Sequence, residues 1–261
     1  MKGSEFLATY AKASQAQWEA AALRETGVDW PMIPVTVTSP TGHSATYNVA
    51  SDYFAVGDPS DFLRLPLTPL TAQRIADAKG LLLSTPKMVT DTWKASSITL
   101  TPHPMVPNKG PNLTQYAEHS KIIDSQLPPN AGMSNLISGH KKDVVLSNLI
   151  RPGKVVIYGW YQLNGTPIQP RTNVHGDFYA DYSHGIRFVA PTMIVDGVQK
   201  NTADVLKDPI LSSLVSDEGP LKIIRYPVSP SPTSSAIARL DSNFDVGTNV
   251  IIVLGMASLS A

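Results

Sequence analysis

The pattern of apolar and polar positions divides the chain into an early helical part and a later β-rich part. A helix is expected over residues 4–25, which are rich in Ala, Glu, Gln and Leu, with Gly27 placed where a C-terminal cap belongs. Three further helices are expected over residues 68–80, 84–96 and 113–127.

The strand signals differ in kind, because β-branched residues alternate with polar ones or form short apolar runs. Residues 34–49 flank the turn sequence SPTG and predict a hairpin. Later runs at 143–150, 154–163 and 185–195 are rich in Val, Ile and aromatic residues, and Asn164–Gly165 is a strong hairpin turn signal.

Helices that come early and strands that come late, without regular alternation, favour an α+β fold. We expect helices mainly in the N-terminal half and a mostly antiparallel sheet in the C-terminal half. We treat residues 1–261 as a single domain, with an N-terminal helix within residues 1–30 and a Pro/Ser-rich loop at 229–236.

Composition narrows the classes of function. Lys and Arg number 21, as do Asp and Glu, so the balanced charge argues against nucleic acid as a partner. The chain has 0 cysteines, which excludes disulfides, thiolate zinc sites and a cysteine nucleophile. No apolar run approaches the roughly 20 residues of a membrane span, so no membrane insertion is expected. A cysteine-free chain suits an exported protein, and we favour a secreted or periplasmic location over a cytoplasmic one.

The stretch VHGDFYADYSHGIRFV, residues 174–189, gathers scarce titratable side chains. Of the 6 histidines in the chain, His119, His140, His175 and His184 fall between positions 119 and 184. The last three lie next to predicted strands, where functional sites are commonly built. Neighbouring strands are therefore expected to bring these three histidines together at one sheet edge.

A metal site is one interpretation of this set. Neutral imidazoles with a carboxylate are the usual zinc ligands when thiolates are absent, so His140, His175, His184 and Asp143 are the expected ligands. Asp177 and Asp181 are also available as the carboxylate. Zinc or another divalent ion would activate a water molecule for hydrolysis. The local spacing matches neither H-E-x-x-H nor H-x-H.

A second interpretation needs no metal. In a lyase acting on an acidic polysaccharide, Arg187 would neutralise a carboxylate, a histidine would take a proton, and Tyr179 or Tyr182 would return one. A third interpretation is a serine nucleophile, Ser138 or Ser183, paired with a histidine and an aspartate.

One local motif resembles a known family. His175–Gly176 followed by Ser183–Arg187, which reads SHGIR, is similar to the L,D-transpeptidase signature of H-G, a spacer and S-H-G-C-I-R. The position of the nucleophilic cysteine is deleted here and the spacer is short. The resemblance covers about thirteen residues and implies a peptidoglycan-related, β-rich fold with lost or replaced thiol chemistry. The strings GHKKDVV and YADYSHGIR also resemble segments of a family of uncharacterised predicted proteins.

The leading hypothesis is a hydrolase acting on a peptide or glycan polymer, with the cell wall as one candidate source of that polymer and metal assistance as an option. The expected catalytic residues are His140, His175, His184, Tyr179, Asp181 and Arg187. The expected substrate-binding residues are Lys141, Lys142, Trp160 and His119. The alternatives are the metal-free lyase, and a non-catalytic binding or structural module in which the histidines form a buried polar network.

Overall fold

The computed structural model describes residues 1–106, 108 and 110–228, and the first 228 residues form one compact unit. The Pro/Ser-rich loop expected at 229–236 lies outside the described residues.

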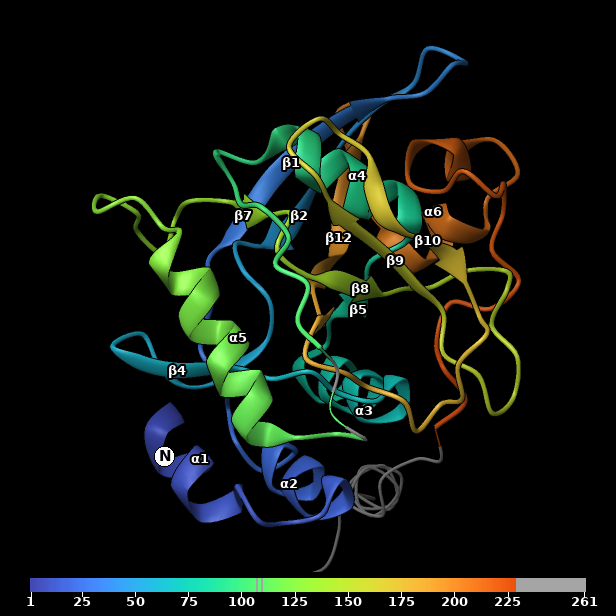
Figure 1. The fold of residues 1–261 in the computed structure, drawn as a ribbon. Helices are drawn as coiled ribbons and strands as arrows, with labels where there is room; N and C mark the ends of the chain where they lie inside the picture. The colour runs from blue at the N-terminus through green and yellow to red at the C-terminus, as the bar shows by residue number, and fades with distance from the viewer. Residues whose placement is uncertain (107, 109, 229–261) are drawn as a thin grey trace, which may run out of the picture. The chain divides into compact units, whose positions relative to one another are not determined.

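Six α-helices and one 3-10 helix are present in the described part of the chain (Figure 1). Their bounds are α1 Gly3–Tyr10, α2 Gln15–Ala22, α3 Pro69–Lys79, α4 Pro86–Ala95, α5 Leu113–Ser125, α6 Thr202–Lys207 and η1 Leu211–Leu214. Helix α4 begins where expected, because the Thr85 side chain accepts a hydrogen bond from the backbone N–H of Met88. Asn112 caps α5 in the same way.

The prediction of one helix over residues 4–25 is wrong, because two helices occupy that region. Helix α1 ends at Tyr10, and Ser14 starts α2 through a capping box in which Gln17 accepts from the Ser14 backbone N–H at 2.9 Å. This reciprocal cap begins a new helix inside a stretch whose composition is helical throughout. Gly27 therefore lies in the following loop and not at a helix end.

The strands form two larger sheets and two short pairs. The first sheet has the order β1-β2-β12-β13, with β5 also paired to β12, and the second has the order β10-β9-β8-β11. The two short pairs are β3–β4 and β6–β7. The bounds of all these strands are β1 Met32–Thr38, β2 Ser44–Ala50, β3 Ala55–Asp58, β4 Asp61–Arg64, β5 Leu82–Leu83, β6 Ile98–Thr99, β7 Ile137–Ser138, β8 Lys142–Val144, β9 Ile157–Tyr161, β10 Pro167–Thr172, β11 His184–Gly185, β12 Phe188–Val195 and β13 Val198–Asn201.

The α+β prediction is confirmed, with most helices early and the sheets mainly antiparallel. The hairpin expected at residues 34–49 is the β1–β2 pair, in which Thr38 faces Ser44. The Asn164–Gly165 turn joins β9 to β10, and Gly165 has a φ of 86°, which favours glycine. The strand expected over residues 143–150 is much shorter, because β8 ends at Val144.

The position of β8 determines how the polar residues meet. It lies between β9 and β11, and its pairing with β11 is parallel, so that Lys142 is opposite His184 and Asp143 is opposite Gly185. Helix α5 packs beside β4 (Figure 1). The chain before β8 and the chain before β11 therefore reach the same part of the interior.

Candidate functional site

Asp181 is the centre of one polar group near the protein surface. Its carboxylate accepts hydrogen bonds from Lys142 Nζ at 2.8 Å, from Tyr179 Oη at 2.7 Å, and from Ser183 through both its backbone N–H at 2.9 Å and its hydroxyl at 2.6 Å. We call this group, together with His184 and His175, the Asp181 cluster. Burial raises the pKa of Asp181, but His184 and Lys142 outweigh burial and hold the pKa well below its usual range. The carboxylate is therefore ionised at neutral pH.

His184 contacts Asp181 through one ring nitrogen. Nδ1 lies 3.2 Å from a carboxylate oxygen of Asp181 and 3.0 Å from the Asp181 backbone nitrogen. A protonated Nδ1 donates to the carboxylate, and an unprotonated one accepts from the backbone N–H. Nε2 is buried and has no hydrogen-bond partner among the described residues. Burial lowers the pKa of His184 although Asp181 opposes this, so the imidazole is neutral at pH 7.

His175 and Tyr179 form the more accessible part of the Asp181 cluster. Their rings are stacked, with centroids 4.0 Å apart, and the Tyr179 ring meets His184 edge-on at 5.4 Å. Both side chains are half-buried, and burial lowers the pKa of His175. Phe178, beside them in the sequence, has 74% of its surface exposed.

His140 belongs to a different, fully buried group. Its Nε2 lies 3.1 Å from Asp52, and Asp52 also pairs with Arg64 at 2.7 Å. Arg64 in turn contacts Asp124 at 2.6 Å. Burial lowers the pKa of His140 to about 4, because Asp52 only partly offsets the loss of hydration. The expected meeting of three histidines at one sheet edge is therefore wrong for His140, which bonds to Asp52 instead.

Arg187 is a structural residue in this fold. Its guanidinium donates to the backbone oxygens of Ala50 and Ile137, both at 2.6 Å, and lies 4.2 Å from the ring centroid of Tyr53. The Tyr53 hydroxyl donates to Asp143 at 2.8 Å. Arg187 is 1% exposed, so it is not available to bind a substrate carboxylate at the surface.

Asp143 lines a small enclosed cavity of about 10 Å³, together with Tyr53, Lys141, Tyr161 and Arg187. Burial raises the pKa of Asp143 to about 7, although Arg187 and Tyr53 oppose this. One of its carboxylate oxygens has no hydrogen-bond partner in the described part of the chain. Asp143 thus has a perturbed pKa but no open route to a polymer substrate.

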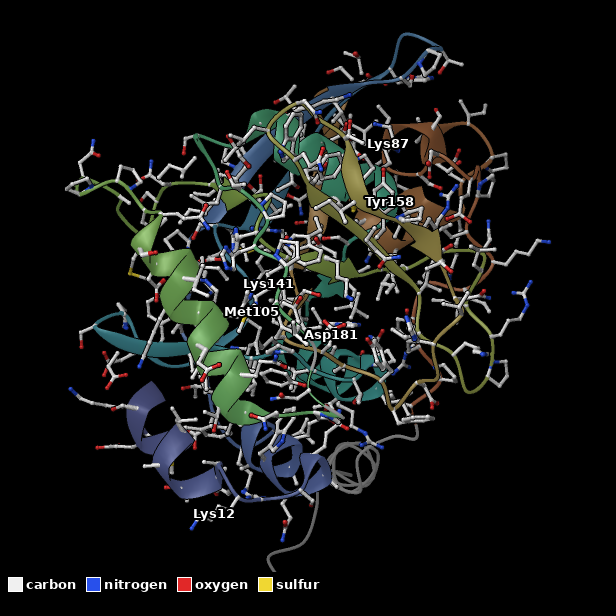
Figure 2. All side chains as sticks on the ribbon, in the orientation of Figure 1. Lys12, Lys87, Met105, Lys141, Tyr158 and Asp181 are labelled. Atoms are coloured by element: carbon white, nitrogen blue, oxygen red, sulfur yellow. The ribbon has the colours of Figure 1, made fainter. Side chains whose placement is uncertain are left out.

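All four predicted substrate-binding residues are buried. Lys141 donates to the backbone oxygen of Tyr182 at 2.6 Å and to His119 Nδ1 at 3.2 Å, and burial lowers its pKa to about 7. His119 is also buried, and burial lowers its pKa to about 2. Trp160 is 7% exposed and packs edge-on against Tyr182. Lys141 and Asp181 are labelled in Figure 2, both in the middle of the view.

Neither the metal ligand set nor a serine–histidine pair is assembled. Within the described residues no three His, Asp or Glu side chains are positioned to hold a metal ion. His140 and His184 are bonded to different aspartates, and Asp143 is bonded to Tyr53, so the four expected ligands are divided between groups. The Ser183 hydroxyl donates to Asp181, and Ser138 accepts from Ser96.

Sequence reasoning missed Asp52, Tyr53 and Arg64. They follow the β1–β2 hairpin and end β4, and the aspartate and arginine are both 1% exposed. The only sequence signal for their role was that Asp52 and Arg64 are charged residues next to apolar strand positions. Their partners are 12 to 90 residues away, which no local pattern shows.

Comparisons with known proteins found no matching family model, no matching curated protein and no matching solved structure. Along the described residues, every helix falls short of the length and apolar character that crossing a membrane requires.

Proposed function

We propose that the chain is a hydrolase acting on a peptide or glycan polymer and that the Asp181 cluster is its active site. The observation that carries this proposal is the contact between His184 Nδ1 and the ionised carboxylate of Asp181, which leaves Nε2 of the same ring without a partner in the described part of the chain. Carboxylate–imidazole pairs of this kind orient a general base.

In this proposal Asp181 holds His184 with the proton on Nδ1, so that Nε2 takes a proton from the attacking water. Because His184 is 0% exposed, this step requires the half-buried His175 and Tyr179, whose ring meets His184 edge-on, to move aside when the polymer binds. The developing imidazolium is stabilised by the carboxylate. The His184 imidazolium then returns this proton to the leaving group, and His175, on the more accessible side of the Tyr179 ring, would contact the polymer. Lys142, which is already bound to Asp181, supplies the positive charge closest to these rings. No step passes through a metal ion.

Lyase chemistry on an acidic polysaccharide is a second candidate, favoured by one observation. His175 and Tyr179 are stacked at 4.0 Å and both reach the surface, which is where a base and a proton donor for β-elimination would have to lie. The difficulty is that Arg187, the expected carboxylate partner, is bonded to backbone oxygens inside the protein.

Product analysis separates these candidates. Purified protein would be incubated with bacterial cell-wall polymer and, separately, with polygalacturonate. Hydrolysis releases new reducing ends or free amines, whereas a lyase releases an unsaturated product that absorbs ultraviolet light. We expect hydrolysis by the wild type, loss of activity in His184→Gln, and retention in His43→Gln, whose ring pairs with Asp196. Absence of every product would contradict both candidates and favour a non-catalytic module.

A further inference from the structure

A second hollow of the molecule contains no residue of the Asp181 cluster. It has a volume of about 310 Å³ and lies where the segment before β1 meets β2, β12 and the end of α3. Small-molecule sites typically have volumes of about 300 to 1,000 Å³ and are mainly apolar, with a few polar groups. This pocket has that size and that composition.

Aromatic side chains form its walls and are held in place by other contacts. The Trp30 indole N–H donates to the backbone oxygen of Tyr53 at 2.8 Å, and its ring meets Phe62 edge-on at 5.1 Å. Phe54 and Phe188, which also line the pocket, pack edge-on at 6.1 Å. A ligand would therefore enter a preformed apolar pocket and would pay little to order its walls.

Two opposite charges line the same pocket. Asp29 and Lys79 are both exposed, and neither forms an ion pair with any described residue, including each other. The Lys79 ammonium donates to the backbone oxygen of Thr26 at 2.6 Å, which leaves two of its three N–H groups for a ligand. The pocket therefore offers one negative and one positive group beside an apolar interior.

We propose that this pocket binds a free amino acid with an apolar side chain. The side chain would lie among Trp30, Phe54 and Phe188, the ammonium group would face Asp29, and the carboxylate would face Lys79. Electrostatic complementarity selects for the zwitterion, because a ligand with only one charge leaves the other pocket charge without a partner. This site is separate from the proposed hydrolase site and does not depend on it.

Calorimetric titration of the full-length protein tests the proposal with three matched probes. These are L-phenylalanine, phenethylamine, which lacks the carboxylate, and 3-phenylpropionate, which lacks the amine. We expect L-phenylalanine to bind, and each analogue to bind about tenfold more weakly, a difference of about 1.4 kcal/mol. Asp29→Asn should weaken the two amines and spare 3-phenylpropionate, and Lys79→Gln should weaken the two carboxylates and spare phenethylamine.

The matched control is Lys12→Gln, an exposed lysine that does not line the pocket. It should leave all three affinities unchanged. Three results would each overturn the proposal: no binding of L-phenylalanine at millimolar concentration, equal binding of all three probes, or binding of L-phenylalanine that neither pocket variant weakens.

Discussion

The Lys142 ammonium lies 2.8 Å from a carboxylate oxygen of Asp181, although the two residues are 39 positions apart in the sequence. The contact exists because β8 and β11 are parallel neighbours, which puts Lys142 opposite His184 while Asp181 lies three residues before that histidine. The cation of one strand thus meets the loop that enters the other strand, and the Asp181 cluster is the result.

Replacing Asp181 with asparagine should damage this cluster. The variant leaves the Lys142 charge without its partner and removes the group that opposes the lowering of the His184 pKa. We expect a loss of about 2 kcal/mol in unfolding free energy and a further fall in the pKa of His184. Urea unfolding and NMR titration of the histidine ring measure the two effects.

Asp177→Asn is the matched control, because Asp177 lies in the same loop and its side chain forms no ion pair within the described residues. Its stability and the His184 titration should match those of the wild type. Equal unfolding free energies and equal His184 titrations in the two variants would contradict a stabilising role for the Asp181 contacts.

The buried pair of Asp52 and Arg64 should be much more costly to break. Both side chains are 1% exposed, so Asp52→Asn leaves the Arg64 guanidinium with only the more exposed Asp124 as a partner and leaves His140 without its carboxylate. We expect a destabilisation of about 3 to 5 kcal/mol, measured by denaturant unfolding. Asp217→Asn removes an exposed pair with Arg171 and should cost less than about 1 kcal/mol. Equal destabilisation by the two variants would contradict the burial of the Asp52–Arg64 pair.

The buried carboxyl of Asp143 should make the protein less stable as the pH rises from about 4 to 7. Burial raises its pKa in the folded state from 3.8 to about 7, so the folded protein holds this proton more tightly than the unfolded chain. The contribution is fully present below about pH 4 and is lost as the pH rises toward 7. Asp143→Asn cannot ionise, so its stability relative to the wild type should increase between pH 4 and pH 7. A stability difference that stays constant over this range would contradict the burial of an ionisable carboxyl at position 143.

Gly185 should not tolerate a side chain. A Cβ atom there would lie 2.5 Å from the Tyr53 ring and 2.8 Å from Lys141 Cβ, in a part of the protein that is already closely packed. We expect Gly185→Ala to cost about 1 to 3 kcal/mol. Gly132→Ala is the control, because the nearest atom to its added Cβ is 4.0 Å away. Thermal unfolding of the two variants gives the comparison, and similar melting temperatures would count against this packing.

Local signals in the sequence were sufficient to predict much of the fold. The β1–β2 hairpin, the turn at Asn164–Gly165 and the start of α4 at Thr85 each depend on residues close together in the chain. The grouping of His175 with His184 was predictable for the same reason, since one ten-residue loop carries both.

Contacts between distant segments were not predictable. Lys141 and Lys142 are typical surface residues by type, yet they are 1% and 6% exposed because β8 lies inside the fold. The position of His140 before a strand favours a role in the site, but the Asp52 that binds it is 88 residues away. The pattern of apolar residues along the chain does not indicate the parallel pairing of β8 with β11.

In the proposed hydrolase Asp181 and His184 act as one catalytic unit, and a double-mutant cycle on the rate of product formation tests this pairing. kcat/KM for hydrolysis of cell-wall polymer would be measured for the wild type, Asp181→Asn, His184→Gln and the double variant, with circular dichroism to confirm that each is folded. We expect the double variant to lose about as much activity as His184→Gln alone, because residues that act as a unit have non-additive effects. Losses that multiply, or full activity in either folded single variant, would contradict it.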